Sequence, residues 1–147
     1  MTVVDKTVAC ERMPIRGDLL AGPLSDLERV TLAGTRCSAC GETCLGKSEF
    51  CPNCGRDTVS QIPLGTRGTL WTYTVVRHRP PGNYKGPEPF TPFGLGLVEL
   101  PEGVRVLAPV RCGIEKLKIG LALRFRPVVG KESDGREVIS FVFEPVD

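Results

Sequence analysis

Four of the seven cysteines lie in two Cys-x-x-Cys-Gly motifs, a spacing that suits the binding of one metal ion. The motifs occupy residues 37–41 and 51–55, with ten residues between the two pairs of cysteines. Each motif brings two thiolates onto one cation, and its glycine allows the backbone to turn. Because four thiolates fill a tetrahedral zinc site and leave no position for water, we predict structural rather than catalytic zinc. The predicted ligands are Cys37, Cys40, Cys51 and Cys54.

Other interpretations of these motifs fit the pattern less well. Iron could occupy the same four-sulfur site, although zinc is the default occupant. A thioredoxin-like redox pair would need a single motif near a βαβ pattern, which the chain lacks. Cys44 lies between the motifs and could compete as a ligand. The pairing of the motifs favours a small buried side chain at that position instead.

A catalytic cysteine is the other chemistry that these residue types allow. Cys10, Cys44 and Cys112 lie outside the motifs, and a thiolate nucleophile needs a nearby base, for which His78 is the single histidine. A Cys–His enzyme is therefore an alternative, but Cys112 ends an apolar run, which favours packing in the core. The nucleophile-elbow and phosphate-loop motifs of enzymes are absent. We predict that the chain has no catalytic residue of its own.

A second group of residues combines positive charge with aromatic rings. Such a combination fits a ligand that has phosphates and a stackable or apolar part, such as a nucleotide or an acyl-CoA. The alternatives are an ordinary solvated loop, or a loop that docks a partner subunit through its aromatic side chains. The predicted ligand-binding residues are Arg77, His78, Arg79, Tyr84, Lys85, Phe90 and Phe93.

The composition limits the kind of protein that presents these groups. The chain has 147 residues, of which 41% are hydrophobic and 24% charged, and this excludes wholesale disorder. Its 17 glycines and 13 prolines favour short strands joined by turns over a helix bundle. A single-stranded nucleic-acid-binding module is an alternative function, because zinc ribbons and OB barrels both bind single strands. The net charge of +2 and the 6% of aromatic residues argue against it.

Membrane association and export are also not expected. No apolar run approaches the roughly 20 residues that span a bilayer. The first residues, Met-Thr-Val-Val-Asp-Lys, lack the basic and then apolar order of a signal peptide. Two Cys-x-x-Cys pairs are typical of a reducing compartment. We therefore expect a cytoplasmic protein.

The elements that would position these groups are mainly strands. The five expected strands are Thr69–Val76, Leu95–Leu100, Val104–Val110, Leu121–Val129 and Glu137–Val142. The second and third flank the turn at 101–103 and predict a hairpin. Five strands with one long insertion fit a five-stranded Greek-key OB-fold barrel, and a small open β-sandwich is the alternative. The insertion at 80–92 contains five prolines, and loops of that length are usually functional or disordered.

The chain before the cysteines is predicted to form an arm with short helical turns over Pro14–Leu20 and Leu24–Val30. Ser25 is the expected N-cap of the second turn, with Glu28 at the capping-box position. The arm is too short to bury a core alone. The expected fold is therefore mainly β: an N-terminal helical arm over 1–32, a rubredoxin-like zinc ribbon over 33–60 and an OB-fold barrel over 61–147.

The order of these segments is characteristic. The cysteine motifs are followed by Gly68–Val76, Leu97–Gly103, Leu117–Gly120 and Phe141–Pro145. In this order they resemble the zinc-ribbon/OB-fold family of acyl-CoA-associated proteins that accompany thiolase-type enzymes. In that family the partner enzyme has the nucleophilic cysteine. The resemblance implies zinc on the four motif cysteines, a thiolase-fold partner subunit and a CoA or acyl-CoA ligand. It also implies a non-catalytic role in shaping access to the partner's active site.

Overall fold

We analysed a computed structural model of the chain, which describes residues 12–82, 84, 86–132 and 134–146. Cys10 and Lys85, both named above, lie outside these residues. The chain forms two compact units. The ribbon unit consists of Met1–Gly65 and Pro127–Phe141, and the barrel unit of Thr66–Arg126 and Val142–Asp147. Each unit is described by itself.

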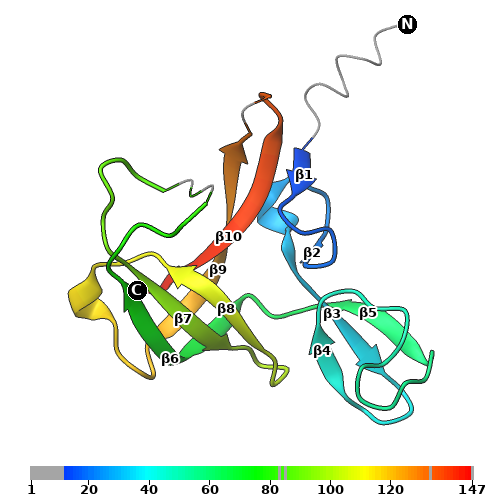
Figure 1. Cartoon of the computed structure of the whole chain (residues 1–147). Coiled ribbons are helices and arrows are strands. Elements are labelled where there is room, and N and C mark those ends of the chain that lie inside the picture. Colours follow the sequence, from blue (N-terminus) through cyan, green and yellow to red (C-terminus); the bar gives the residue numbers. More distant parts are fainter. Residues whose placement is uncertain (1–11, 83, 85, 133, 147) are drawn as a thin grey trace, which may run out of the picture. The chain divides into compact units, whose positions relative to one another are not determined.

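The five strands expected after the cysteines are all present (Figure 1). They pair in the order β10-β8-β7-β6-β9, and an additional pairing of β9 with β10 closes the barrel. The β6–β7, β7–β8 and β6–β9 pairs are antiparallel, whereas β8 and β10 run parallel. The structure therefore confirms the OB-type barrel over the open sandwich. The bounds are β6 Arg67–Val76, β7 Phe93–Glu99, β8 Arg105–Val110, β9 Ala122–Lys131 and β10 Glu137–Pro145, with the 3₁₀ turn η2 at Ile114–Lys116.

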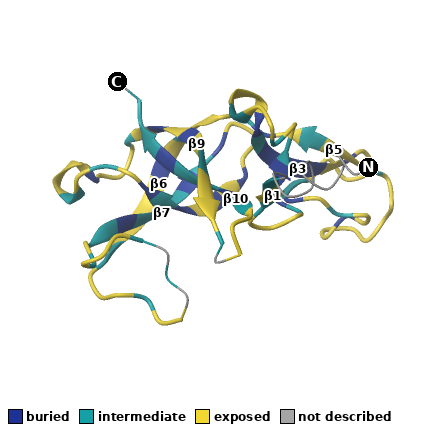
Figure 2. Cartoon of the chain, turned by 90° about the horizontal axis from the view of Figure 1, so that it is seen from above, coloured by how far each residue is buried: buried dark blue, intermediate teal, exposed yellow. Residues whose placement is uncertain are grey.

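The interior of the barrel unit follows from the alternation of side chains along its strands. In β7 the buried residues are Gly94, Gly96 and Val98, and those between them are half-buried. Leu70, Val98, Leu123 and Phe143 are completely buried. In Figure 2 buried stretches lie on the strands of this unit, whereas the described residues of the loop before β7 are exposed or half-buried. The apolar runs in the sequence therefore form one continuous core in this unit.

The ribbon unit contains a small sheet, in which β3 pairs with three neighbours. β3 spans Thr31–Cys37 and lies antiparallel to β2 (Leu20–Ala21), β4 (Thr43–Leu45) and β5 (Val59–Pro63). The buried apolar side chains beside this sheet are Leu19, Leu20, Val30, Leu32, Ala33 and Leu64. β3 therefore joins a small apolar core at its start to the first cysteine motif at its end.

The predicted helical arm is wrong. Residues Arg12–Pro14 form β1, which pairs in parallel with Glu137–Ile139 of β10, and Leu20–Ala21 forms β2. The one helical turn before β3 is the 3₁₀ helix η1, Leu27–Arg29. Its N-cap is Asp26, not Ser25, and the Asp26 carboxylate accepts a hydrogen bond from the Glu28 amide at 3.3 Å. Pairing with β10 at Pro14 and with the nearby β3 at Leu20 overrides the weak local helix signals.

The helices among the described residues are the short 3₁₀ turns η1 and η2, and no α-helix occurs there. Neither turn is long and apolar enough to cross a membrane.

Candidate metal centre

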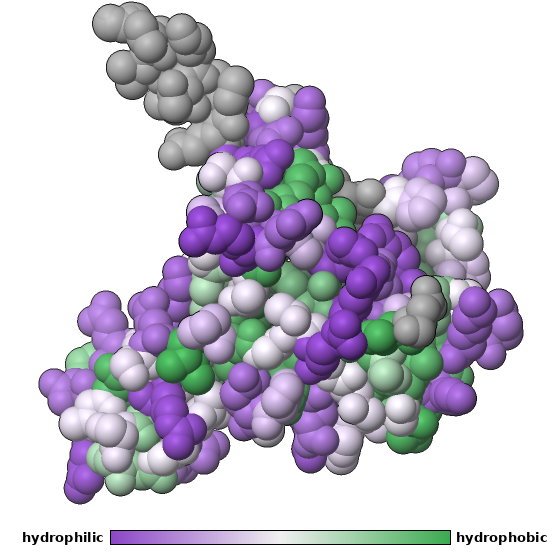
Figure 3. Space-filling model, turned by 180° about the vertical axis from the view of Figure 1, so that it is seen from behind, coloured by the Kyte–Doolittle hydropathy of each residue, from purple (hydrophilic) through white to green (hydrophobic). Residues whose placement is uncertain are grey.

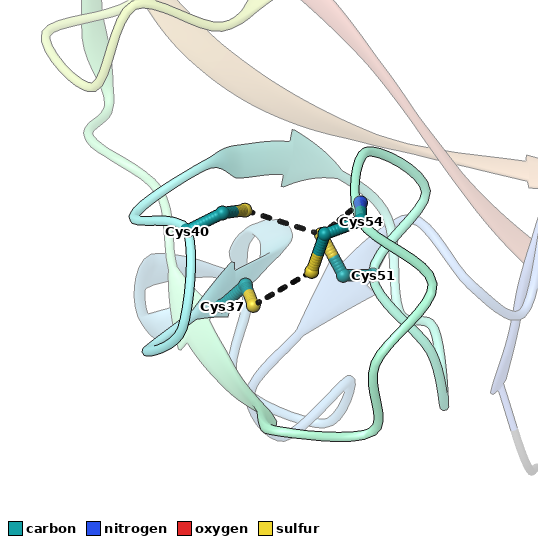
Figure 4. A group of neighbouring side chains, drawn as sticks. All are labelled: Cys37, Cys40, Cys51 and Cys54. Atoms are coloured by element: carbon teal, nitrogen blue, oxygen red, sulfur yellow. Dashed lines mark hydrogen bonds between the residues drawn. The ribbon is translucent and has the colours of Figure 1, made fainter.

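The four motif cysteines meet at one end of the ribbon sheet (Figure 4). Cys37 is the last residue of β3, Cys40 follows in the next turn, and Cys51 and Cys54 lie between β4 and β5. Cys37 and Cys51 are buried, whereas Cys40 and Cys54 are exposed. All four sulfur atoms lie within 4.8 Å of one another. The structure thus places the predicted ligands in one cluster.

The two motifs have the same backbone turn. The Gly41 amide donates to the Cys37 carbonyl at 2.9 Å, and the Gly55 amide donates to the Cys51 carbonyl at 2.8 Å. Both glycines have a φ of +80°, a backbone conformation that other residues adopt only with strain. The glycine that ends each motif therefore allows the turn that contains its two cysteines.

The sulfur separations fit a tetrahedral metal ion. The Cys37 and Cys54 Sγ atoms are 3.7 Å apart, and those of Cys40 and Cys51 are 3.6 Å apart. Four sulfurs about 2.3 Å from a central zinc would be separated from one another by about 3.8 Å. Each close pair joins one motif to the other, so a single ion would link both turns.

Hydrogen bonds to the sulfur atoms favour ionised thiolates. The pKa of Cys37 is lowered to about 6, first by the Thr58 hydroxyl and next by the Cys40 amide. The pKa of Cys40 is also lowered, chiefly by the side chain of Asn53, whose Nδ2 donates to the Cys40 sulfur at 3.5 Å. At Cys54 the Arg56 amide lowers the pKa, but partial loss of hydration of the sulfur and the neighbouring sulfurs together raise it to about 11. A bound cation would relieve this repulsion among the sulfurs.

Thr35 fixes the segment between the two motifs. Its side chain is buried, and its Oγ1 donates to the Gly46 carbonyl at 2.7 Å. The same oxygen accepts a hydrogen bond from the Ser48 amide at 3.0 Å. Sequence analysis did not single out this residue. Its place beside the apolar run Leu32-Ala33-Gly34 is the available signal.

We expect Thr35→Val to destabilise the ribbon unit by about 1–3 kcal/mol, because a carbonyl and an amide inside the fold would lose their partner. Chemical denaturation of the metal-loaded protein measures the change. Thr31→Val is the matched control on the same strand, since its hydroxyl bonds only the carbonyl of the next residue. An equal loss of stability in both variants would contradict this role for Thr35.

The cysteines outside the cluster have raised pKa values. Cys44 lies on β4, is half-buried and is not part of the four-cysteine cluster. Burial is the main cause that raises its pKa, and the same holds for Cys112, which follows β8. Both positions are half-buried, whereas we predicted buried side chains. Thiols with raised pKa values are poor nucleophiles near neutral pH.

The predicted ligand-binding residues separate into two groups. Tyr84, Phe90 and Phe93 form an aromatic cluster with ring centroids 5.8–6.3 Å apart. The Arg79 guanidinium lies 5.4 Å from the centre of the Tyr84 ring and forms an ion pair with Glu88. Arg77 and His78 are exposed beyond the end of β6 and lie outside this cluster. Arg79 therefore has both an ionic partner and an aromatic partner within its own loop. Whether these residues bind a ligand stays a prediction.

Apolar side chains cover part of the outer face of the barrel unit. The sequence analysis did not predict this apolar surface. Trp71 is 46% exposed and Leu107 is 62% exposed. Leu97 of β7 lies directly between Thr72 of β6 and Leu107 of β8 in the strand register. On the face of the molecule shown in Figure 3, hydrophobic side chains reach the surface in several separate areas among hydrophilic ones. Large contiguous apolar patches mark contacts with other proteins, and in the register of β7 and β8 Leu97 and Leu107 are direct neighbours.

Comparison with known proteins defines the class to which this fold belongs. Residues 61–127 match the family described as the ChsH2 C-terminal OB-fold domain. The solved structure titled Ltp2-ChsH2(DUF35) aldolase has the same fold, with a TM-score of 0.58 and 24% identity over 78% of this chain and 84% of that chain.

Two curated relatives extend the similarity across the ribbon. The chain is 30% identical over 138 residues to the benzoylsuccinyl-CoA thiolase subunit BbsA of Thauera aromatica, covering 88% of this chain and 85% of that protein. It is also 30% identical over 122 residues to a DUF35 domain-containing scaffold protein of Pyrococcus furiosus, covering 81% and 86%. The chain therefore belongs to the family of BbsA and the DUF35 scaffold proteins. The resemblance drawn from the motifs is confirmed.

Proposed function

We propose that this protein is a non-catalytic subunit of a thiolase-type complex and shapes the access of CoA or acyl-CoA to the partner's active site. The relationship to BbsA, named as a thiolase subunit, is the observation on which the proposal depends. Thiolysis of 2-benzoylsuccinyl-CoA is the first reaction to test, because the name of that relative specifies it. A thiolase-fold protein is the proposed partner, and the cytoplasm is the proposed location.

The chemistry of the described residues supports a non-catalytic role. Thiolytic cleavage needs a nucleophilic cysteine, a base for the incoming CoA thiol and an oxyanion hole. Four cysteines form the cluster, and Cys44 and Cys112 have raised pKa values. We propose zinc as the ion held by Cys37, Cys40, Cys51 and Cys54. Four sulfur ligands would leave no open position, so the ion would supply folding energy only.

The outer face of the barrel supports a protein partner rather than nucleic acid. OB folds bind oligonucleotides on the face of their second and third strands, which correspond to β7 and β8 here. That face presents Leu95, Leu97, Leu107 and Pro109. Its cation, Arg105, is paired with Glu99 at 3.2 Å and stacked on Trp71 at 4.0 Å. Nucleic-acid grooves present free cations to the phosphate backbone instead.

Affinity purification of the tagged protein from its native cells is expected to recover a thiolase-fold protein. The isolated complex is expected to cleave 2-benzoylsuccinyl-CoA or a related acyl-CoA with CoA, whereas the tagged protein alone remains inactive. Turnover by the protein alone would contradict a non-catalytic role. Tight and salt-sensitive binding of a labelled oligonucleotide, with no enzyme recovered, would favour the nucleic-acid alternative.

The same complex can test the loop over 80–92. We propose that this loop contacts CoA, so Arg79→Ala and Lys85→Ala should raise the KM for CoA about tenfold without loss of assembly. Failure of assembly would instead make the loop a partner interface. Arg16→Ala, in the ribbon unit, is the matched control, because that side chain is exposed and paired with Asp18.

A further inference from the structure

Three arginines of the barrel unit converge on one carboxylate. Glu144 of β10 accepts hydrogen bonds through Oε1 from Arg126 at 2.8 and 3.0 Å and from Arg124 at 3.2 and 3.3 Å. Its Oε2 accepts a longer bond from Arg111 at 3.4 Å. The two β9 arginines alternate with the buried Leu123 and Phe125, so both point outward from the barrel. One carboxylate therefore holds three guanidiniums in fixed positions.

A fourth arginine lies next to this group. Arg67 of β6 is the direct partner of Arg124 in the antiparallel β6–β9 register. Like charges that face each other across two strands destabilise a sheet. No ion pair of Arg67 is present within the described part of the chain. We call the four side chains Arg67, Arg111, Arg124 and Arg126 the arginine surface.

The arginine surface has more positive than negative charge. Three guanidiniums share the Glu144 carboxylate, and Arg67 adds a fourth positive charge beside Arg124. Glu99, which lines a cleft with Arg67, is itself paired with Arg105. The net charge of the whole chain is +2. The Glu144 side chain is 19% exposed, and the three arginines bound to it are 44–55% exposed. Hydrogen bonding from Arg126 is the main cause that lowers the pKa of Glu144, which stays ionised at neutral pH. Glu144 thus orients the guanidiniums while most of the positive charge stays available to solvent.

We infer that the arginine surface binds the dianionic phosphate of a small phosphorylated ligand. Planar guanidiniums in a fixed arrangement match phosphate oxygens by paired, charge-assisted hydrogen bonds. A dianion compensates the excess charge better than one further carboxylate would. Arg67 also lines an open cleft of about 430 Å³ formed with Gly68, Thr69, Glu99, Leu100, Pro101 and Gly103, which offers space for the rest of the ligand. The inference depends on the arginines alone and stands whether or not the protein is a thiolase subunit.

Calorimetric titration of the full chain with pyrophosphate at low ionic strength tests the site. We expect saturable binding to one site, weakened about tenfold by Arg124→Gln and by Arg126→Gln. Arg124→Lys keeps the charge but loses the planar fork, so it should also weaken binding. Arg16→Gln, an exposed arginine of the ribbon unit, should leave binding unchanged. Thermal melting of each variant establishes that it is folded.

Competition distinguishes two sources of the phosphate. Displacement of pyrophosphate by CoA would identify a CoA-type nucleotide as the ligand, and its absence would point to another small phosphate compound. The inference is overturned if pyrophosphate does not bind, or binds equally to the arginine variants and the wild type. It is also overturned if a single-stranded oligonucleotide binds more tightly than pyrophosphate. The same holds if the arginine variants bind pyrophosphate normally but no longer bind the partner protein.

Discussion

Removal of the metal is expected to unfold the segment that contains the two cysteine motifs, over residues 33–60. Apparent binding free energies of structural zinc are about 10–16 kcal/mol in small zinc-binding peptides. That exceeds what the few apolar side chains around the cysteines supply, because Cys40 and Cys54 are exposed and the apolar core lies at the other end of β3. Elemental analysis should find about one zinc per chain. Treatment with a chelator, or Cys51→Ser, should then abolish the ordered NMR signals of Gly41 and Gly55.

Cys44→Ser provides the control for this experiment. Cys44 lies in the same sheet but outside the cluster, so its substitution should leave the metal content unchanged. A metal-free protein that melts at the normal temperature would show that the cluster does not stabilise the fold. Iron in place of zinc would keep the structural role but change the ion that we propose.

Gly96→Val is expected to destabilise the barrel by about 3 kcal/mol or more. A Cβ atom at this position would lie 2.5 Å from Leu70 Cδ1 and 2.9 Å from Val110 Cγ2. Leu70 is completely buried and Val110 nearly so, hence neither side chain can move aside without shifting its neighbours. Chemical denaturation followed by the fluorescence of Trp71 measures the change in free energy of unfolding.

A graded pair of variants separates this steric effect from the general cost of replacing glycine. Gly96→Ala adds only the Cβ atom and should cost less than Gly96→Val. Gly130→Val is the strand control, because a Cβ atom there has one neighbour, a backbone oxygen at 3.8 Å. Its effect should be within about 0.5 kcal/mol, as at ordinary surface positions. Equal effects at both glycines would contradict close packing as the reason for Gly96.

The cluster of four cysteines could be predicted because it is a local property of the chain. Two residues between paired cysteines and a following glycine specify each turn, and the structure shows the same hydrogen bond in both. The strands could be predicted for a similar reason, since Thr69–Val76 is dense in β-branched and aromatic residues. The N-terminal segment could not, because its structure depends on pairing with Glu137–Ile139, far along the chain.

The arginine surface was beyond sequence analysis for the same physical reason. Arg124 and Arg126 are two residues apart in a strand, so their common face was predictable. Their proximity to Arg67, Arg111 and Glu144 depends on the register of β6 with β9 and on the approach of β8 and β10. The contacts of Arg79 with Glu88 and Tyr84 in its own loop also depend on the three-dimensional structure, and ligand binding by the cations at 77–85 stays a prediction.

The division of the chain into two units also limits how its parts can be exchanged. The segment Pro127–Phe141 belongs to the ribbon unit, although it follows the first segment of the barrel unit in the sequence. The polypeptide therefore passes between the units three times. A single recombination point between two related genes therefore cannot exchange one complete unit for another. A fragment limited to residues 61–127, the stretch that matches the family model, ends within β9 and omits β10. Such a fragment would leave the β8 edge unpaired at Val110 and open to aggregation, so separate expression of the barrel requires the C-terminal strand to be carried with it.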